Sequence, residues 1–257
     1  MLLKKYLCGL ICVISTTCTP ATRPIPNPPP TVNPPTQILP LKGAIGAHDP
    51  VIIKADGRYY RFATGPGIPM GCSPDLISWT DCGRVFSRLP VSAFKSVPEV
   101  QDLWAPDIAL FNGKYHLYYS ASTFGSNHSA IALATNTTLD SRNKDYKWVD
   151  EGVVVESRAT NNYNTIDPNF VLDQEGKAWL SFGSFWTGIK LIELDLTTGK
   201  PKADSALIAL AQRSTSTAIE APFITYKDGY YYLFVSFDQC CKGVDSTYHI
   251  RVGRSKA

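Results

Sequence analysis

The chain has 257 residues, of which 44% are hydrophobic, so it is long and apolar enough for one sizeable domain with a packed core. Its formal net charge of +3 arises in residues 1–42, which hold four of the 25 basic residues and no acidic one. The rest is close to neutral, which excludes the strongly basic surface of a nucleic-acid-binding protein. The 11% of aromatic residues favours β structure.

Residues 1–21 have the pattern of a secretory signal peptide. Lys4 and Lys5 form a basic start, an apolar run follows at 6–15, and Thr19-Pro20-Ala21 is a loose cleavage site. The apolar run is too short to span a membrane as a helix. We therefore expect a secreted or cell-surface protein. The alternatives are a cytoplasmic N-terminal helix and a lipid anchor attached to Cys18.

Residues 22–42 are expected to form a proline-rich linker. Nine prolines lie within residues 20–40. Because proline fixes φ and lacks an N–H group, such a stretch favours an extended polyproline II conformation. A folded domain is therefore predicted over residues 43–257.

This domain contains four similar segments, the most informative feature of the sequence. In each, a proline is followed by a β-prone run, a turn glycine and a second, aromatic β run. The prolines are Pro50, Pro106, Pro168 and Pro222, and they lie 56, 62 and 54 residues apart. The glycines are Gly57, Gly113, Gly176 and Gly229, and they follow their prolines after 7, 7, 8 and 7 residues. Repeated units of this kind predict an all-β propeller. A β-sandwich is the alternative, but its strands would not come in four similar groups.

Within the units we expect strands and no helix of useful length. First strands are predicted at 51–53, 108–110, 170–172 and 223–225, second strands at 115–120 and 230–236, third strands at 130–134, 189–194 and 250–253, and fourth strands at 83–86, 152–155 and 206–210. The fourth unit stops in its third strand. Either an N-terminal strand closes a four-bladed ring, or the chain is a fragment of a larger propeller. We favour the fragment, and we expect residues 1–257 alone to fold poorly and to show little activity.

Three acidic residues lie beside the repeated prolines: Asp49, Asp167 and Glu220. First strands line the channel of a propeller, so we expect these side chains at matching points of blades one, three and four, facing one cavity. Trp104 of blade two should lie at a similar height, with Asp107 just beyond. A single Asp before Pro is usually a turn or cap residue. Three like charges in a confined space are costly unless a cation, a proton or a reaction uses them, so the set indicates a functional site.

The motifs around these residues resemble those of glycoside hydrolase family 43. They are Ala47-His48-Asp49-Pro50, Leu103-Trp104-Ala105-Pro106-Asp107, Ile166-Asp167-Pro168-Asn169 and Ile219-Glu220-Ala221-Pro222. Two further stretches, residues 164–167 with 181–186 and residues 234–241, are similar to motifs of the endo-1,5-α-L-arabinanases within that family. The resemblance covers residues 43–257. It implies a five-bladed propeller, with about four blades in this chain, that cleaves internal α-1,5 bonds of plant arabinan with inversion and without an organic cofactor.

The resemblance also implies a role for each acid. Asp49 matches the general base that activates water, and Glu220 matches the general acid that protonates the leaving oxygen. Asp167 matches a third carboxylate that orients the acid and raises its pKa by like-charge repulsion. Inversion requires roughly 6.5–9.5 Å between base and acid, a gap that residues on different blades can supply.

Sugar contacts are implied for a wider set of residues: Asp49, Trp104, Gly125, Asn164, Thr165, Ile166, Asp167, Ser184, Phe185 and Trp186. The rings of Trp104 and Trp186 suit stacking on a furanose, although aromatic residues also pack between blades. Two other functions stay open: an exo-acting arabinofuranosidase or β-xylosidase, and a sugar-binding or structural propeller without catalysis. No nucleic-acid or protein partner is expected.

The sequence also indicates which residues can bind a metal ion and which cysteines can pair. The family often carries a calcium ion on the propeller axis, held by waters and a fifth-blade histidine that would lie beyond Ala257; no metal ligand is identifiable in this chain. No spacing of His and Cys resembles a zinc site. Cys72 and Cys82 flank a short turn-rich segment and can pair. A bond between the adjacent Cys240 and Cys241 would need a strained ring, and we expect a structural pair beside the pocket.

Overall fold

Four β-sheets make up the part of the chain that the structure, a computed structural model, describes: residues 39–256. The folded unit begins at Leu39, slightly before the predicted boundary. The predicted signal peptide, the Cys18 anchor and most of the linker lie outside the described residues. Within those residues, no helix is long and apolar enough to cross a membrane.

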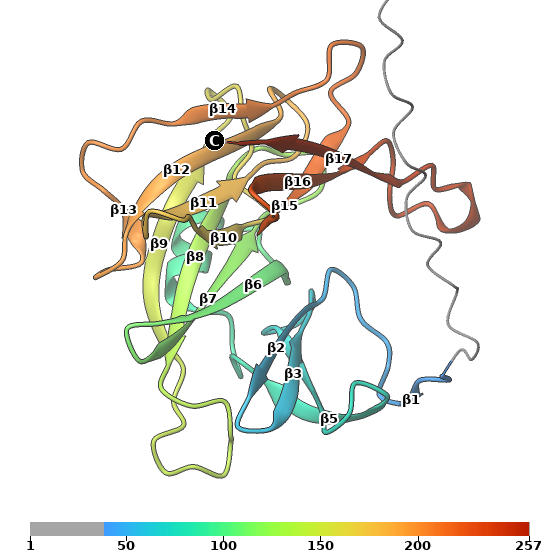
Figure 1. The fold of residues 1–257 in the computed structure, drawn as a ribbon, viewed down its shortest axis with the longest axis vertical. Coiled ribbons are helices and arrows are strands. Elements are labelled where there is room, and N and C mark those ends of the chain that lie inside the picture. Colours follow the sequence, from blue (N-terminus) through green and yellow to red (C-terminus); the bar gives the residue numbers. More distant parts are fainter. Residues whose placement is uncertain (1–38, 257) are drawn as a thin grey trace, which may run out of the picture. The chain divides into compact units, whose positions relative to one another are not determined.

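The sheets follow one another in chain order, as the blades of a propeller do (Figure 1). Blade one contains β1 (Lys42–Gly43), β2 (Val51–Ala55), β3 (Arg58–Phe62), β4 (Pro69–Ser73) and β5 (Ser78–Arg84); blade two contains β6 (Leu103–Phe111), β7 (Lys114–Ala121), β8 (Ser129–Asn136) and β9 (Val149–Ser157). Blade three contains β10 (Asn169–Leu172), β11 (Ala178–Phe182), β12 (Ile189–Asp195), β13 (Lys200–Pro201) and β14 (Ile208–Ala211); blade four contains β15 (Ile219–Lys227), β16 (Tyr230–Phe237) and β17 (His249–Ser255). The first strands β2, β6, β10 and β15 contact one another in that order. The predicted propeller is therefore confirmed.

The turn between the first two strands of a blade explains the repeated glycines. At Asp56-Gly57 and Asn112-Gly113 both residues have positive φ, between 47° and 78°. A two-residue hairpin turn of this type matches the twist of its strands and demands residues that tolerate the left-handed region, which Asp, Asn and Gly do. The turn chemistry thus fixes the register of each hairpin.

Side chains between the blades form the core. In β7, Leu117 and Tyr119 pack in the cluster shared by blades one and two, whereas Tyr118 between them packs in the cluster shared by blades two and three. Successive residues of a strand point to opposite faces, so a central blade must be apolar on both. This explains why β7 reads as an almost continuous aromatic run.

The structure differs from the strand predictions in three places. A short helix, α1 (Val91–Ser96), follows β5; its six residues are too few to give a readable helical period. The fourth strand of blade one is β5 (Ser78–Arg84), earlier than the predicted 83–86. The N-terminal strand β1 pairs in parallel with β5 on the outer edge of blade one, and no strand within residues 39–256 pairs with the free edge of β17.

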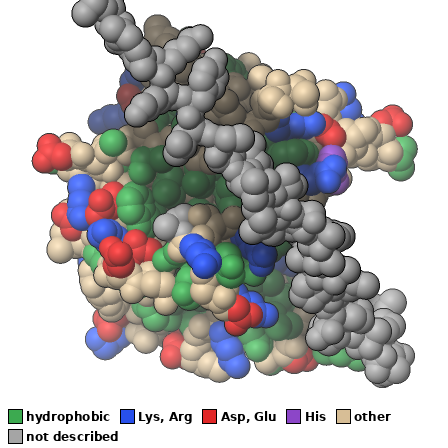
Figure 2. Space-filling view, turned by 45° about the horizontal axis from the view of Figure 1, so that its top comes forward, with side chains coloured by type: hydrophobic (Ala, Val, Ile, Leu, Met, Phe, Trp, Pro, Cys, Tyr) green, Lys and Arg blue, Asp and Glu red, His purple; other side chains and the backbone are tan. Residues whose placement is uncertain are grey.

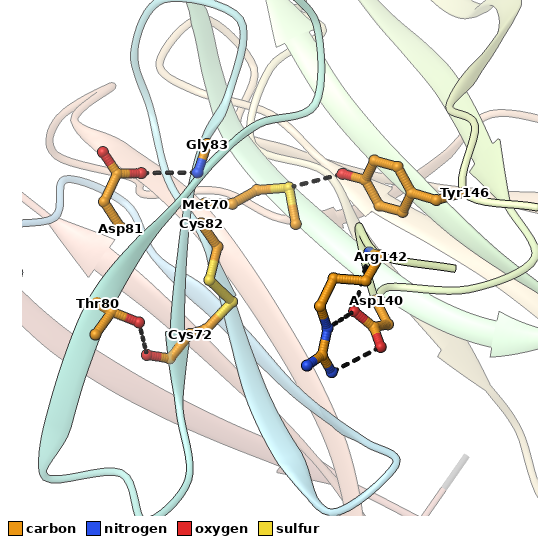
Figure 3. The surroundings of a disulfide bond; sticks show 9 residues. All are labelled: Met70, Cys72, Thr80, Asp81, Cys82, Gly83, Asp140, Arg142 and Tyr146. Carbon is orange, nitrogen blue, oxygen red and sulfur yellow. Dashed lines mark hydrogen bonds and ion pairs between the residues drawn. A yellow bond between two sulfur atoms is a disulfide. The ribbon is translucent and has the colours of Figure 1, made fainter. Parts of the chain in front are cut away.

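The predicted pair Cys72 and Cys82 forms a disulfide that joins β4 to β5 (Figure 3). Beside it, the Thr80 hydroxyl donates to the carbonyl oxygen of Cys72 at 3.3 Å, as part of the same strand pairing. The side chain of Cys72 is buried in the core cluster between blades one and two. This disulfide therefore secures the outer half of blade one to its inner half.

A buried carboxylate connects the first strands of blades two, three and four. Asp107 Oδ2 accepts hydrogen bonds from the backbone N–H of Phe170 at 2.6 Å and from Asn169 Nδ2 at 3.2 Å. Asn169 Oδ1 in turn accepts the backbone N–H of Ile224 at 2.8 Å. Burial raises the pKa of Asp107 to about 6, although these hydrogen bonds act to lower it.

Asp107 should make the stability of the protein fall as the pH rises from about 4 to about 6. The folded form binds the proton more tightly than the unfolded form, so the stabilisation is present at low pH and is lost through the pKa of about 6. The loss should amount to about 3 kcal/mol. Urea unfolding between pH 4 and 7 gives the free energy of unfolding of the wild type and of Asp107→Asn. The wild type should lose stability over this range, and the variant should lose less, because it has no carboxyl group at this position. Equal pH dependence of the two proteins would contradict it.

Candidate active site

The entrance to each first strand has an unusual backbone. The residue before the repeated proline has positive φ in all four blades; the residues are Asp49 (44°), Ala105 (41°), Asp167 (59°) and Ala221 (52°). Asp49 and Asp167 thus lie at matching points, as predicted. The prediction that Glu220 lies at this same point was wrong, because Glu220 lies one residue further from its proline. Its position in blade four matches that of Trp104 in blade two: Glu220 pairs with Ser236, and Trp104 pairs with Ser120.

The backbone N–H groups at these points bind side chains of the preceding blade. The Ala105 N–H donates to Thr64 Oγ1 at 2.8 Å, and the Asp167 N–H donates to Ser120 Oγ at 3.0 Å. At the third junction Gly183 occupies the place of these hydroxyl residues, and the Ala221 N–H donates instead to the carboxylate of Asp167, Oδ2, at 3.0 Å. Asp167 is therefore held by the junction between blades three and four.

Asp49 lies at the exposed side of the group. Its Oδ2 accepts the Thr64 hydroxyl at 2.8 Å and lies 3.4 Å from His48 Nε2. Its side chain is 45% exposed. Within the described residues its second oxygen, Oδ1, has no hydrogen-bond partner, so it can accept a proton from water. Asp49 thus has the geometry of an accessible base.

Asp167 has a strongly perturbed acidity. Burial raises the pKa of Asp167 well above its ordinary value, and the negative charges of Glu220 and then Asp49 raise it further. Asp167 therefore lies within electrostatic reach of both Glu220 and Asp49, and the repulsion expected between Asp167 and Glu220 is present.

Glu220 is bound through both carboxylate oxygens. Its Oε2 accepts the Ser184 hydroxyl at 2.6 Å, and its Oε1 accepts the Tyr248 hydroxyl at 2.9 Å. Ser184 follows β11 in blade three, whereas Tyr248 directly precedes β17 in blade four. The sequence repeat gives no signal for Tyr248, because the loop before a third strand has no counterpart in it.

A pocket of about 700 Å³ opens beside Glu220. It is lined by Glu220 together with Trp104, Ser122, Thr123, Phe124, Gly125, Ser126, Asn164, Ile166, Ser184, Phe185, Trp186, Thr217, Gln239, Cys240, Cys241 and Lys242. Seven of the ten residues predicted to contact sugar belong to this lining. Asp49, Thr165 and Asp167 do not.

The motif at residues 164–166 divides between pocket and core. Asn164 lines the pocket, and its buried Oδ1 has no hydrogen-bond partner among residues 39–256, so it can accept a hydroxyl of a ligand. Thr165 is fully buried, and its hydroxyl donates to the carbonyl oxygen of Ser129 at 2.7 Å. This placement does not support a sugar contact for the Thr165 side chain. Its hydrogen bond instead fixes the loop that presents Asn164.

Aromatic rings supply the apolar part of the wall. Trp104 packs against Phe124 with ring centroids 5.1 Å apart, and Phe124 is 82% exposed. Trp186 is exposed as well, with a positive φ of 39°. Exposed rings at a pocket suit the flat, partly apolar face of a sugar.

The adjacent cysteines form part of the same wall. Cys240 and Cys241 are joined by a disulfide and line the pocket, so the expected pair beside the pocket is present and bonded. Their loop is held by Asp238, which accepts Arg213 Nη1 at 2.5 Å. The neighbouring Lys242 was missed by the sequence analysis, because a lone lysine in a loop gives no signal.

No group of three or more His, Cys, Asp or Glu side chains within residues 39–256 is arranged to hold a metal ion. These residues do not by themselves supply a ligand set for the axial calcium ion that the resemblance implies. The reaction proposed for this site therefore does not involve that ion.

On the face drawn in Figure 2, acidic and basic side chains are interspersed around the periphery.

This chain is similar in sequence to known extracellular proteins. The chain is 49% identical over 216 residues to the extracellular endo-α-(1→5)-L-arabinanase 1 of Bacillus subtilis, with 82% of the chain and 65% of that protein covered. It is 44% identical over 224 residues to the extracellular exo-α-(1→5)-L-arabinofuranosidase ArbA of Cellvibrio japonicus, with the same coverage. The chain thus spans about 65% of the length of these relatives.

A solved structure and a family profile agree with these relatives. The family 43 endo-arabinanase from Bacillus licheniformis superposes with a TM-score of 0.80 at 47% identity, covering 86% of this chain and 75% of that one. Residues 44–257 match the profile of the glycosyl hydrolases family 43. The chain therefore belongs to glycosyl hydrolase family 43.

Proposed function

We propose that this protein is an inverting glycoside hydrolase that cleaves internal α-1,5-L-arabinofuranosidic bonds of arabinan. The observation that carries the proposal is the placement of three acids, Asp49, Asp167 and Glu220, in blades one, three and four, each held by hydrogen bonds, with Glu220 lining a pocket that has exposed aromatic rings. The relatives named as arabinanases support the choice of substrate. We also propose a secreted or cell-surface location, since two relatives are named extracellular.

In this proposal Asp49 acts as the general base. Thr64 holds Oδ2, so the carboxylate is oriented while Oδ1 takes a proton from water. The water attacks the anomeric carbon from the side opposite the leaving oxygen, which inverts the configuration. The 45% exposure of the Asp49 side chain lets water reach it.

Glu220 acts as the general acid. It lines the pocket, so the leaving oxygen of a bound sugar can approach its carboxyl group. As the bond to the anomeric carbon breaks, the proton of Glu220 passes to that oxygen. Asp167, held by the Ala221 N–H, lies close to Glu220, and the repulsion between the two carboxylates disfavours their ionising together. The site can therefore complete the cycle with one base and one acid.

An exo-acting arabinofuranosidase is the second candidate, because a relative with 44% identity carries that name. Both enzymes would use the same three acids. They differ in whether the chain of sugars can extend past the pocket in both directions. The size of the first products separates them.

Hydrolysis of linear arabinan tests the proposal directly. We expect early release of oligosaccharides of several lengths, and NMR of the first product should show the β-anomer at the new reducing end. A single short product released from the chain ends would establish the exo-acting alternative. The test uses the full-length protein, because residues 1–257 alone are expected to show little activity; no release of reducing ends by a folded full-length protein would establish a propeller without catalysis.

A further inference from the structure

The acid Glu220 is set in a clamp of two hydroxyl groups from different blades. Ser184 of blade three binds Oε2 at 2.6 Å, and Tyr248 of blade four binds Oε1 at 2.9 Å. Within the described residues these are the only hydrogen bonds to the Glu220 carboxylate. Neither donor carries a charge. The clamp therefore fixes the direction of the carboxylate without forming an ion pair that would hold it permanently ionised.

Tyr248 contacts the carboxylate of Glu220 directly. It does not belong to the lining of the pocket, whereas Ser184 does. Burial raises the pKa of the Tyr248 hydroxyl, and the nearby charge of Glu220 raises it further. Tyr248 therefore keeps its proton over the working pH range of an enzyme and cannot replace Glu220 as the acid. Its hydroxyl remains a hydrogen-bond donor throughout.

The charge on Glu220 changes during the proposed reaction. Glu220 is neutral before it donates its proton and is a carboxylate afterwards, so negative charge develops on its oxygens in the transition state. A donor that already points at the oxygen stabilises this charge without reorganisation. The repulsion between Asp167 and Glu220 acts in the opposite sense. Loss of a donor should therefore slow proton transfer while leaving sugar binding intact.

We propose that Tyr248 is a positioning residue for the acid: its hydroxyl orients Glu220 and stabilises the carboxylate that forms as the proton leaves. This inference rests on the proposed function, because it needs Glu220 to act as the acid. Tyr248 acts through Glu220 and makes no contact with the reacting atoms. Its contribution should be greatest where the leaving group most needs a proton.

Tyr248→Phe in the full chain tests the inference, because it removes one hydroxyl and keeps the ring. We expect kcat on arabino-oligosaccharides to fall roughly tenfold or more, with KM changed less than about twofold. On aryl arabino-oligosaccharides with a dinitrophenol leaving group, which needs little protonation, the fall should be less than about threefold. Thermal unfolding of the variant should match that of the wild type.

Tyr226→Phe is the matched control. Tyr226 lies in the same blade, with an exposure of 38% against 40% for Tyr248, at the far end of β15 from Glu220. It should match the wild type on both substrates. Ser184→Ala, alone and combined with Tyr248→Phe, gives a second measure: the two losses should not be additive, because both hydroxyls act on one carboxylate.

Two results would overturn the inference. One is a Tyr248→Phe enzyme that equals the wild type on both substrates. The other is an equal loss of kcat on the two substrates, which indicates a purely structural role. In either case wild-type hydrolysis of arabinan leaves the proposed function standing, whereas a wild type inactive on arabinan would overturn the proposed function first.

Discussion

Replacing Asp49 or Glu220 by alanine in the full chain is expected to lower turnover of linear arabinan by roughly 10³-fold or more, because each change removes one of the two proton-transfer groups. Neither change should disturb the fold, since both side chains lie at the channel entrance and not in the blade cores. Reducing-end release measures the loss, and circular dichroism checks the fold.

Substrates with a good leaving group should distinguish the two variants. Glu220→Ala should recover much of its rate on a dinitrophenyl arabino-oligosaccharide, because the leaving phenolate needs no proton, whereas Asp49→Ala should not, because water still lacks a base. Asp145→Ala is a suitable control; the Asp145 side chain is exposed and, within residues 39–256, pairs only with its neighbour Lys144. Near-normal hydrolysis of arabinan by either active-site variant would rule out the assigned roles.

Gly183→Ala should damage the fold next to the site. A Cβ at Gly183 would lie 2.6 Å from the backbone oxygen of Gly188, and its φ of 134° is one that other residues rarely adopt. Together these effects should lower the free energy of unfolding by about 3 kcal/mol or more. Because Ser184 follows directly and binds Glu220, activity should fall as well. Urea unfolding and arabinan hydrolysis measure the two losses.

Gly113→Ala provides the comparison for this change. Gly113 also has a positive φ, 70°, but a Cβ there would have no neighbour within 4 Å. Only the conformational cost remains, about 1 kcal/mol, and activity should be unchanged because the turn lies far from Glu220. A Gly183→Ala protein as stable as Gly113→Ala would show that the segment at Gly188 can move aside, contrary to the expectation.

Local rules explain what could be predicted from the sequence. The spacing of prolines and glycines gave the propeller because each hairpin turn needs positive φ at fixed points, as at Asp56-Gly57. The same regularity located Asp49 and Asp167. It placed Glu220 one residue off, although Glu220 lies two residues before its proline and the other two acids lie directly before theirs; the pairing of Glu220 with Ser236 shows what this offset means in the structure.

The contacts that tune the site could not be predicted, because they depend on packing between blades. Thr64 and Ser120 look like ordinary strand residues, yet each binds the N–H group at the entrance of the next blade. Tyr248 lies in a loop outside the repeat and meets Glu220 only through the fold. Thr165 belongs to a motif that resembles a sugar-binding one, but the fold turns its side chain inward.

The four residues before the repeated prolines have a consequence for how this scaffold can change. All four have a positive φ: Asp49, Ala105, Asp167 and Ala221. The propeller therefore offers four equivalent backbone positions, of which two carry an acid and two carry a methyl group. At Ala105 and Ala221 the side chain is only a methyl group, so a functional group can be added there on the existing backbone, whereas the carboxylate of Asp167 also accepts the Ala221 N–H and is part of the junction between two blades. The blades thus fix the backbone at these four positions, and the side chains at them decide the chemistry, so new reactions can evolve by single substitutions on the same fold.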